Sequence, residues 1–472
     1  MRLKNVLLIH PMHEKLGDSR ERISMQFPWG IGYLTKYYQT AGYNVRVLDG
    51  QCMQLTKDEI LPWIDKHDFD IAGISAFSSQ FNSVKLIAEH IKKTHRTPVI
   101  VGGALSTYQP QLTLKNTDVD VCVIGDGEIS GIEVLDHFDE LDRVKGIAFR
   151  KRGEVFFTQP QDKFVSLDDL PMPDFSLFEM DKYLSEGRPF AGGLAAKDRS
   201  IRFITSRGCP YSCHFCSKSA RTYRAMSPSK VHNMAAFFKN EFKIGEISFG
   251  DELFLASKSR FRELAPQLKS LGLKWGSQAR VNIVDKEFLD LIKWSGCEGL
   301  GYGIETGSQK ILDNMNKGIT VEQIVNAMAY TKKLKIPMKV QLIFGYPGED
   351  EATVQETIEL FRRVDHPGRR FVVITPIPGS QLYADCIRQG RIKDEIAHLT
   401  AIEKSFGWGK VHVNFTKWPD DEIYPRKHAA EAAIENNYQN RNLFRRVKYF
   451  TKRAKRRIER TIGKSRKKRV GS

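Results

Sequence analysis

The sequence lacks long apolar runs and holds few cysteines, and each scarcity excludes a class of protein. No apolar stretch approaches the about 20 residues that span a bilayer. The run at residues 6–9 is too short for a signal peptide and no cleavage site follows it, so we interpret it as a first β-strand. Seven cysteines in 472 residues are too few for a disulfide framework, which favours a cytoplasmic, reducing compartment. Four cysteines are scattered and are interpreted as small buried side chains: Cys52, Cys122, Cys297 and Cys386.

Most of the chain also lacks an excess of either charge, although the formal net charge is +17. Residues 441–472 hold fifteen Lys and Arg and one acid, a net of +14, so the other 440 residues carry only +3. A basic amphipathic helix is typical of peripheral contact with the inner face of a membrane. The alternatives are a solvated tail and nucleic-acid binding. Nucleic-acid binding is disfavoured because Phe444 and Tyr449, outside the apolar stripe, are too few to stack bases. The apolar stripe of this tail is Leu443, Val447, Phe450, Ala454 and Ile458.

Three cysteines are present in a tight cluster, with the spacing C-x3-C-x2-C over Cys209, Cys213 and Cys216. They follow an apolar strand predicted at residues 201–205. Three thiolates on one loop can bind three irons of a [4Fe–4S] cluster and leave the fourth iron open for chemistry. Zinc is the alternative, but a structural zinc needs four ligands, usually in two pairs, and no second cysteine pair follows. We do not expect His214, between two of the cysteines, to share a metal with them.

This motif, with the aromatic Phe215 before its last cysteine, resembles the signature of radical S-adenosylmethionine enzymes. The resemblance extends over about residues 200–385. It implies that the open iron is chelated by the amino and carboxylate groups of S-adenosylmethionine. It also implies that an electron from an external one-electron reductant cleaves the C–S bond and yields a 5′-deoxyadenosyl radical. A cluster of this kind is easily oxidised, so we expect a setting low in oxygen.

The first third of the chain alternates strands with helices, which predicts a doubly wound parallel sheet. Such sheets bind ligands beyond the carboxyl ends of their strands. Small and polar residues lie at those ends, and glycines there let a bulky ligand approach the backbone. The predicted strands are residues 6–9, 44–49, 70–75, 99–103 and 119–124, and the candidate contacts are Ser75, Ser78, Gly102, Gly103, Gly125 and Glu128.

These strand ends, over about residues 5–135, resemble the cobalamin-binding domain that precedes the radical domain in one large subfamily. The matching stretches are 28–34, 41–45, 73–75, 101–103 and 125–128. Cobalamin proteins of another branch carry Asp-x-His-x-x-Gly, whose histidine ligates cobalt from below. His13 and Gly17 have the wrong spacing for that motif. We therefore expect cobalamin without a histidine lower ligand, with the residues near Ser75 and Ser78 facing cobalt.

After the cysteine loop the alternation resumes, and six strands predict an open (β/α)6 partial barrel with all strand ends on one rim. The resemblance implies roles for several rim residues. Gly250, Asp251 and Glu252 match a Gly-Gly-Glu segment that binds the methionyl amine, although Asp251 is an added carboxylate without an assigned role. Arg280 pairs with the methionyl carboxylate. Contacts to the ribose and the adenine are expected from Glu305 and Ser308 and from residues 345–349 respectively. The strands are residues 202–205, 246–249, 274–278, 299–303, 338–344 and 371–376.

The sequence thus predicts four regions. They are a cobalamin-binding Rossmann-like domain (1–145), a linker (146–197), a radical core (198–390) and a helical, basic C-terminal extension (391–472). Residues 406–409 and 411–415 are expected near the barrel mouth. The predicted function is cobalamin-dependent methylation of an unactivated carbon in a small-molecule or lipid-like substrate. A radical cyclisation or rearrangement and a membrane-anchored cofactor sensor are alternatives. A tRNA methylthiotransferase is disfavoured because residues 1–150 hold only Cys52 and Cys122.

Overall fold

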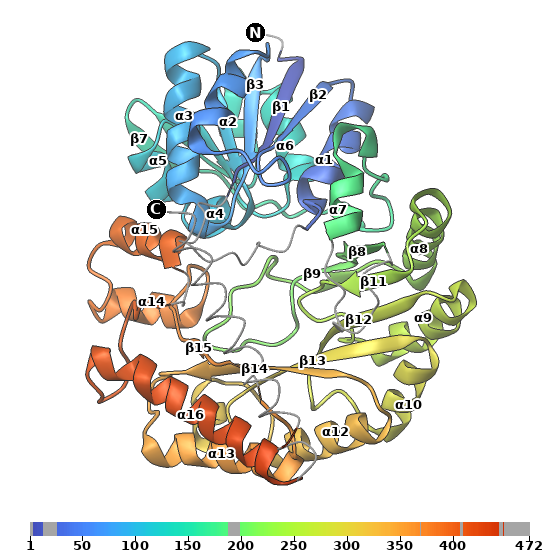
Figure 1. Ribbon diagram of the computed structural model, residues 1–472. Helices are drawn as coiled ribbons and strands as arrows, with labels where there is room; N and C mark the ends of the chain where they lie inside the picture. The colour runs from blue at the N-terminus through green and yellow to red at the C-terminus, as the bar shows by residue number, and fades with distance from the viewer. Residues whose placement is uncertain are drawn as a thin grey trace, which may run out of the picture.

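The computed structural model describes residues 3–12, 26–186, 199–368, 370–405, 409–442 and 447. Two α/β units stack on each other, with the loop that carries the three cysteines between them (Figure 1). His13, residues 406–408 and most of the basic tail lie outside the described residues. Within the described residues, no helix has the length and apolar character needed to cross a membrane.

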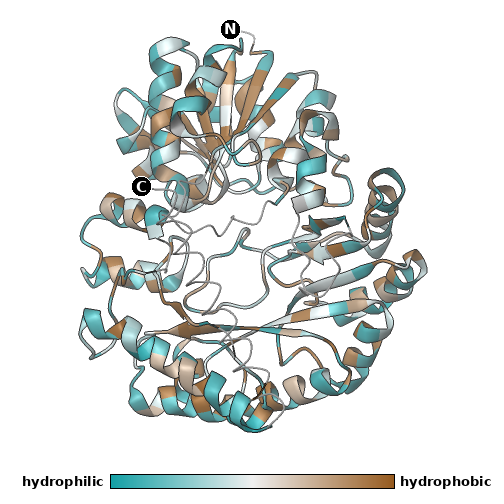
Figure 2. Cartoon of the chain, in the orientation of Figure 1, coloured by the Kyte–Doolittle hydropathy of each residue, from teal (hydrophilic) through white to brown (hydrophobic). Residues whose placement is uncertain are grey.

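The first unit is built on a seven-stranded sheet in the order β2-β1-β3-β4-β5-β6-β7. Its first five strands in this order are parallel, as the sequence predicts, and β6 and β7 add an antiparallel hairpin that the sequence analysis does not predict. The apolar sheet is sandwiched between helices whose outer faces are polar (Figure 2). The strands are β1 (Asn5–His10), β2 (Asn44–Asp49), β3 (Ile71–Ser75), β4 (Val99–Gly102), β5 (Val121–Val123), β6 (Ile147–Lys151) and β7 (Glu154–Phe157).

Helices cover both faces of this sheet. In α3 the side chains of Val84, Ile87, Ala88 and Ile91 recur at helical spacing on one face, and each is at most 1% exposed. The helices are α1 (Trp29–Thr40), α2 (Lys57–Asp65), η1 (Ser78–Gln80), α3 (Phe81–Thr94), α4 (Gly103–Tyr108), α5 (Pro110–Asn116), α6 (Gly127–Asp136) and η2 (Phe138–Arg143). Two further elements, η3 (Phe175–Leu177) and α7 (Met180–Glu186), lead toward the second unit.

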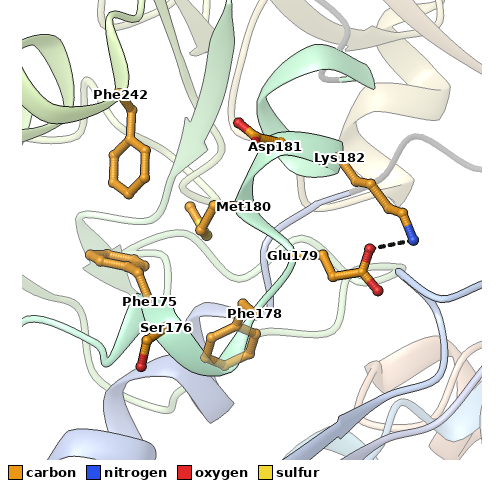
Figure 3. Close-up of a pocket in the computed structure, with 8 residues that line it drawn as sticks. All are labelled: Phe175, Ser176, Phe178, Glu179, Met180, Asp181, Lys182 and Phe242. Atoms are coloured by element: carbon orange, nitrogen blue, oxygen red, sulfur yellow. Dashed lines mark ion pairs between the residues drawn. The ribbon is translucent and has the colours of Figure 1, made fainter.

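A hollow of about 530 Å³ lies where η3 and α7 meet helix α8 (Pro228–Phe242) (Figure 3). Phe175, Phe178 and Phe242 give it an apolar lining, and an ion pair between Glu179 and Lys182 borders it. None of its lining residues belongs to the site predicted from the sequence.

The second unit contains a six-stranded parallel sheet in the order β15-β14-β13-β12-β11-β8, the predicted partial barrel. Its strands are β8 (Ser200–Phe203), β11 (Glu246–Phe249), β12 (Lys274–Ala279), β13 (Cys297–Glu305), β14 (Met338–Phe344) and β15 (Val372–Val373). Besides α8, its helices are α9 (Lys258–Leu271), α10 (Lys286–Trp294), α11 (Gln309–Asn314), α12 (Val321–Lys333), α13 (Glu351–Val364), α14 (Gln381–Arg388), α15 (Glu395–Ser405) and α16 (Asp420–Asn440).

Two helices of this unit begin with a serine cap. Ser227 accepts a hydrogen bond from the backbone N of Lys230 at the start of α8, and Ser257 does the same for Arg260 at the start of α9. On β13, Leu300, Tyr302 and Ile304 are fully buried in the apolar core that the sheet forms with its helices. Because strand side chains alternate, the residues between them face the barrel interior, and here they are glycines. The central strand therefore leaves room inside the barrel.

The C-terminal part returns to the first unit. The carboxylate of Glu403 in α15 accepts hydrogen bonds from the backbone and side chain of Asn82 and from Ser83 Oγ, both on α3. Phe415 lies within the segment expected near the barrel mouth. Its side chain packs against the same apolar cluster as that of Phe215. The half-barrel is thus attached to the first unit from both ends of its sequence.

Candidate functional site

A two-stranded ribbon closes the base of the cysteine loop. β9 (Ser206–Arg207) pairs antiparallel with β10 (Arg224–Ala225), and all three cysteines lie between them. Gly208, just before Cys209, has a φ of +77°, and a Cβ there would come within 2.7 Å of the carbonyl oxygen of Thr222. Only glycine fits this tight return without strain.

His214 is engaged by the protein through both ring nitrogens. Its Nδ1 lies 2.6 Å from the hydroxyl of Tyr346, and its Nε2 lies 2.8 Å from Oδ2 of Asp385. Across the described ranges, no three His, Cys, Asp or Glu side chains are arranged to hold one metal ion. His214 is thus held by Tyr346 and Asp385 of the protein itself.

Arg280 lies beside the cysteines. Its Nη1 is 3.4 Å from Sγ of Cys213, and its guanidinium stacks 3.7 Å from the ring centre of Tyr211. A second amino group of Arg280 donates to the backbone carbonyl of Lys317. The pKa of the Cys209 thiol is raised, chiefly by burial. Three sulfur donors on one loop, each free of a disulfide, fit a cluster.

The segment after β11 fastens the cysteine loop on two sides. Asp251, 2% exposed, accepts hydrogen bonds from the backbone N and Oγ1 of Thr205 at 2.9 and 3.0 Å, and from Ser206 Oγ. Burial raises the pKa of Asp251. Glu252 accepts from the backbone N of Ser219, beyond the last cysteine. The added carboxylate that the sequence left without a role therefore anchors the entry to the loop.

Gly250 is required for a different reason. A Cβ at this position would lie 1.9 Å from Nε of Arg202, whose side chain passes directly over it. The missing side chain lets Arg202 occupy this part of the barrel interior, where its Nε has no partner among the described residues.

Glu305 and Ser308 follow β13, as predicted, and both are buried. Glu305 pairs with Lys317, whose Nζ also lies 5.6 Å from the ring centre of Phe215. Lys317 is absent from the sequence prediction, because it follows a short helix and belongs to no motif. Ser308 is fully buried and its Oγ has no partner in the described part of the chain. An orphaned buried hydroxyl of this kind suits a polar ligand such as a ribose.

The segment after β14 combines a turn with a buried acid. Gly345 has a φ of +81°, Tyr346 is fully buried, and the backbone N of Gly345 donates to Oε2 of Glu349 at 2.5 Å. Burial raises the pKa of Glu349 to about 8. This carboxyl group is therefore largely protonated at neutral pH and adds little charge beside the predicted adenine site.

The predicted cobalamin contacts lie at the carboxyl edge of the first sheet. Ser75 ends β3, Ser78 begins η1, and Gly103 has a φ of +84° where a Cβ would meet the carbonyl oxygen of Ala76 at 2.7 Å. Gly102 and Gly125 have nothing within 4 Å on their Cβ side, so this edge has room for a bulky ligand.

Two residues of this edge are directed elsewhere. His10, at the end of β1, is buried with its Nδ1 3.1 Å from Oδ1 of Asp49, so its ring is not presented to a ligand. Glu128, expected among the cobalamin contacts, is 3% exposed, and its carboxylate pairs with Arg207 of β9 in the other unit. The sequence could not foresee this partner, because Arg207 is 79 residues away.

Comparison with known proteins agrees with this geometry. Residues 24–135 match the B12 binding domain and residues 203–361 match the radical SAM superfamily. An uncharacterized methyltransferase of Pyrococcus horikoshii is 30% identical over 81% of this chain and 83% of its own. An anaerobic magnesium-protoporphyrin IX monomethyl ester cyclase of Rubrivivax gelatinosus is 28% identical over 80% of this chain and 69% of its own.

Among solved structures, the radical S-adenosylmethionine methyltransferase TsrM from Kitasatospora setae shares the fold. Its TM-score is 0.66 at 17% identity, over 83% of this chain and 79% of that one. The chain belongs to the family of radical S-adenosylmethionine enzymes that carry an N-terminal cobalamin-binding domain. It is an enzyme whose cofactors are a [4Fe–4S] cluster, S-adenosylmethionine and cobalamin, as the sequence predicts.

Proposed function

We propose that the protein transfers a methyl group to an unactivated carbon of a small-molecule or lipid-like substrate. One observation carries this proposal: the glycine-bearing edge of the first sheet touches the cysteine loop. Tyr108, at the end of α4, donates from its hydroxyl to the carbonyl of Lys218, two residues beyond Cys216. Tyr108 also lies against Gly379, which follows the sixth strand of the half-barrel. A substrate held at this junction is within reach of both cofactor sites.

The cofactors, when bound, supply a radical able to abstract hydrogen and a carrier able to donate methyl. The residues of this chain supply the surroundings. Arg280 places a positive charge beside Cys213, and Ser308 offers a buried hydroxyl to the nucleoside. Phe215 and Tyr346, with the apolar side chains packed around them, exclude water from the rim. A dry, oriented site limits unwanted reactions of a reactive intermediate.

A radical cyclisation is the second candidate, and the similarity to the cyclase of Rubrivivax gelatinosus favours it. The mass of the product separates the two reactions, because methylation adds one methylene unit and cyclisation does not. A methylthiotransferase would need a second cluster in the first unit. The first unit holds two cysteines in its described residues, and both are buried: Cys52 in the turn after β2 and Cys122 on β5, which weighs against a methylthiotransferase.

The test begins with anaerobic purification, reconstitution with iron, sulfide and cobalamin, and assays for all three. On reduction with dithionite in the presence of S-adenosylmethionine, we expect formation of 5′-deoxyadenosine, which also excludes a sensor that only binds its cofactors. Candidate substrates are then screened for a product heavier by one methylene unit. Failure to cleave S-adenosylmethionine in fully loaded protein would overturn the proposal.

A further inference from the structure

Two carboxylates of the first unit pair with two arginines of the second: Asp126 lies in the loop after β5, and Glu128 lies in the first turn of α6. Oε1 of Glu128 lies 2.6 Å from Nη2 of Arg207, and Oε2 lies 3.1 Å from its Nη1. Asp126 lies 3.0 Å from the same Nη1 and also pairs with Arg224. The Glu128 side chain is 4% exposed, and the other three are between 16% and 22% exposed. The four side chains form one largely desolvated network, called here the interdomain charge network.

The two arginines hold the base of the cysteine loop. Arg207 on β9 and Arg224 on β10 are direct partners in the ribbon, and Cys209 follows Arg207 by two residues. Two positive charges side by side repel each other unless carboxylates neutralise them. Asp126 contacts both guanidinium groups and Glu128 holds one of them in a bidentate pair, the geometry that best fixes an arginine.

The carboxylates stand on a backbone that is itself fixed. The backbone N of Gly125 donates to Oγ1 of Thr107 at 3.0 Å, and the carbonyl of Gly127 accepts from the hydroxyl of Tyr38 at 3.0 Å. Gly125 has a φ of +87° and open space on its Cβ side. The loop is thus free on the side where a ligand would lie, and anchored to the cysteine loop on the other.

We propose that Asp126 and Glu128 are positioning residues that set the separation and orientation of the cobalamin edge relative to the cluster. They act through Arg207 and Arg224 and do not contact either cofactor. The physical reason is that buried ion pairs are directional, and removing one member leaves an uncompensated charge that the structure must move to hydrate. A reaction that uses two cofactors on one substrate depends on their relative placement. This inference rests on the proposed function in requiring that both cofactors be bound at once.

The experiment measures the distance between the two cofactors in the holoenzyme by pulsed electron paramagnetic resonance, with cob(II)alamin and the reduced cluster as the spins. In the wild-type protein we expect a single narrow distance. In Asp126→Asn/Glu128→Gln we expect that narrow maximum to be lost, with iron and cobalt contents unchanged. The single variant Glu128→Gln leaves Asp126 bridging both arginines and should broaden the distribution less. It also provides a measurement should the double variant fold poorly.

The matched control is Asp162→Asn, which breaks the exposed pair between Lys145 and Asp162 in the first unit and should leave the distance unchanged. An unaltered distribution in the double variant overturns the inference, as does loss of cobalt from it, since these carboxylates would then be cofactor contacts. Wild-type protein that holds no cobalt overturns both this inference and the proposed function. A narrow distance without methylated product counts against the proposed function alone.

Discussion

Nζ of Lys317 lies 2.6 Å from Oε1 of Glu305, and each side chain is 7% exposed. The pair sits above Gly303, where a Cβ would come within 2.6 Å of the same carboxylate oxygen. Glu305 also holds a backbone φ of +63°, the left-handed region that a non-glycine residue adopts at a cost of about 1–3 kcal/mol. The half-barrel therefore maintains both a buried ion pair and a strained backbone at the end of β13, where the nucleoside is expected to bind.

Replacing Lys317 by methionine should lower the free energy of unfolding by about 3–5 kcal/mol, because Glu305 would be left as an unpaired buried charge. Urea denaturation measures this change. Lys310→Met is the control, since Lys310 pairs with Asp350 at 3.4 Å on the exposed surface. That change should cost less than about 1 kcal/mol. Equal effects of the two changes would show that the buried pair adds nothing special to stability.

Alanine at Cys209, Cys213 or Cys216 should greatly reduce the iron and sulfide that the reconstituted protein retains, because each thiolate is expected to bind one iron of the cluster. Iron and sulfide assays on anaerobically prepared protein make the measurement. Cys386→Ala is the control, because Cys386 is buried outside the loop and should leave the iron content unchanged. Full retention of iron and sulfide in the triple alanine variant would refute the cluster assignment.

Asp251→Asn and Asp251→Leu should differ. Asparagine keeps an acceptor for the Thr205 and Ser206 donors, whereas leucine leaves them buried and unsatisfied, at a cost of about 1–3 kcal/mol. Because these donors lie at the entry to the cysteine loop, we also expect the leucine variant to retain less iron. Thermal or urea denaturation, with iron analysis, tests both points. Indistinguishable variants would mean that Asp251 is not an anchor.

The buried carboxyl of Glu349 should make stability depend on pH. Burial raises its pKa to about 8 in the folded protein, from an ordinary value of 4.5 when unfolded. Between pH 4.5 and pH 8 the Glu349 carboxyl group is more fully protonated in the folded protein than in the unfolded protein. The contribution of this group to the free energy of unfolding therefore falls as pH rises. Glu349→Gln should therefore have little effect near pH 4.5 and stabilise by about 3–5 kcal/mol near pH 9. Urea denaturation at both values gives the difference, and equal shifts at both would contradict it.

The basic tail leads to a prediction from the sequence alone. Removing the residues after Asn440 should abolish binding to anionic liposomes and leave cleavage of S-adenosylmethionine intact, because the charge lies outside the catalytic domains. Liposome sedimentation and a 5′-deoxyadenosine assay measure the two properties separately. Liposome binding that survives the truncation would rule out membrane contact through this segment.

The sequence by itself determined the features that are encoded locally. The spacing of three cysteines, the alternation of strands and helices and the residues at strand ends predicted both sheets and the family. Strand periodicity is a property of neighbouring residues, so β1 to β5 and the six strands of the half-barrel could be predicted without knowing their packing. The β6–β7 hairpin was missed although residues 147–149 and 155–157 are apolar and flank a turn at Arg152 and Gly153. Two short antiparallel strands depart from the strand–helix alternation by which the other strands were predicted.

Only the tertiary structure decided which side chains meet. Glu128 forms an ion pair with Arg207, and Lys317 forms one with Glu305. Asp251 accepts a hydrogen bond from the backbone of Thr205. Such partners depend on how two sheets and a loop pack together, and in a buried site each charge must find a counter-charge or hydrogen bond wherever the fold provides one. Motif spacing predicts which residues bind the cofactors. The packing of the fold determines which partners hold those residues in place.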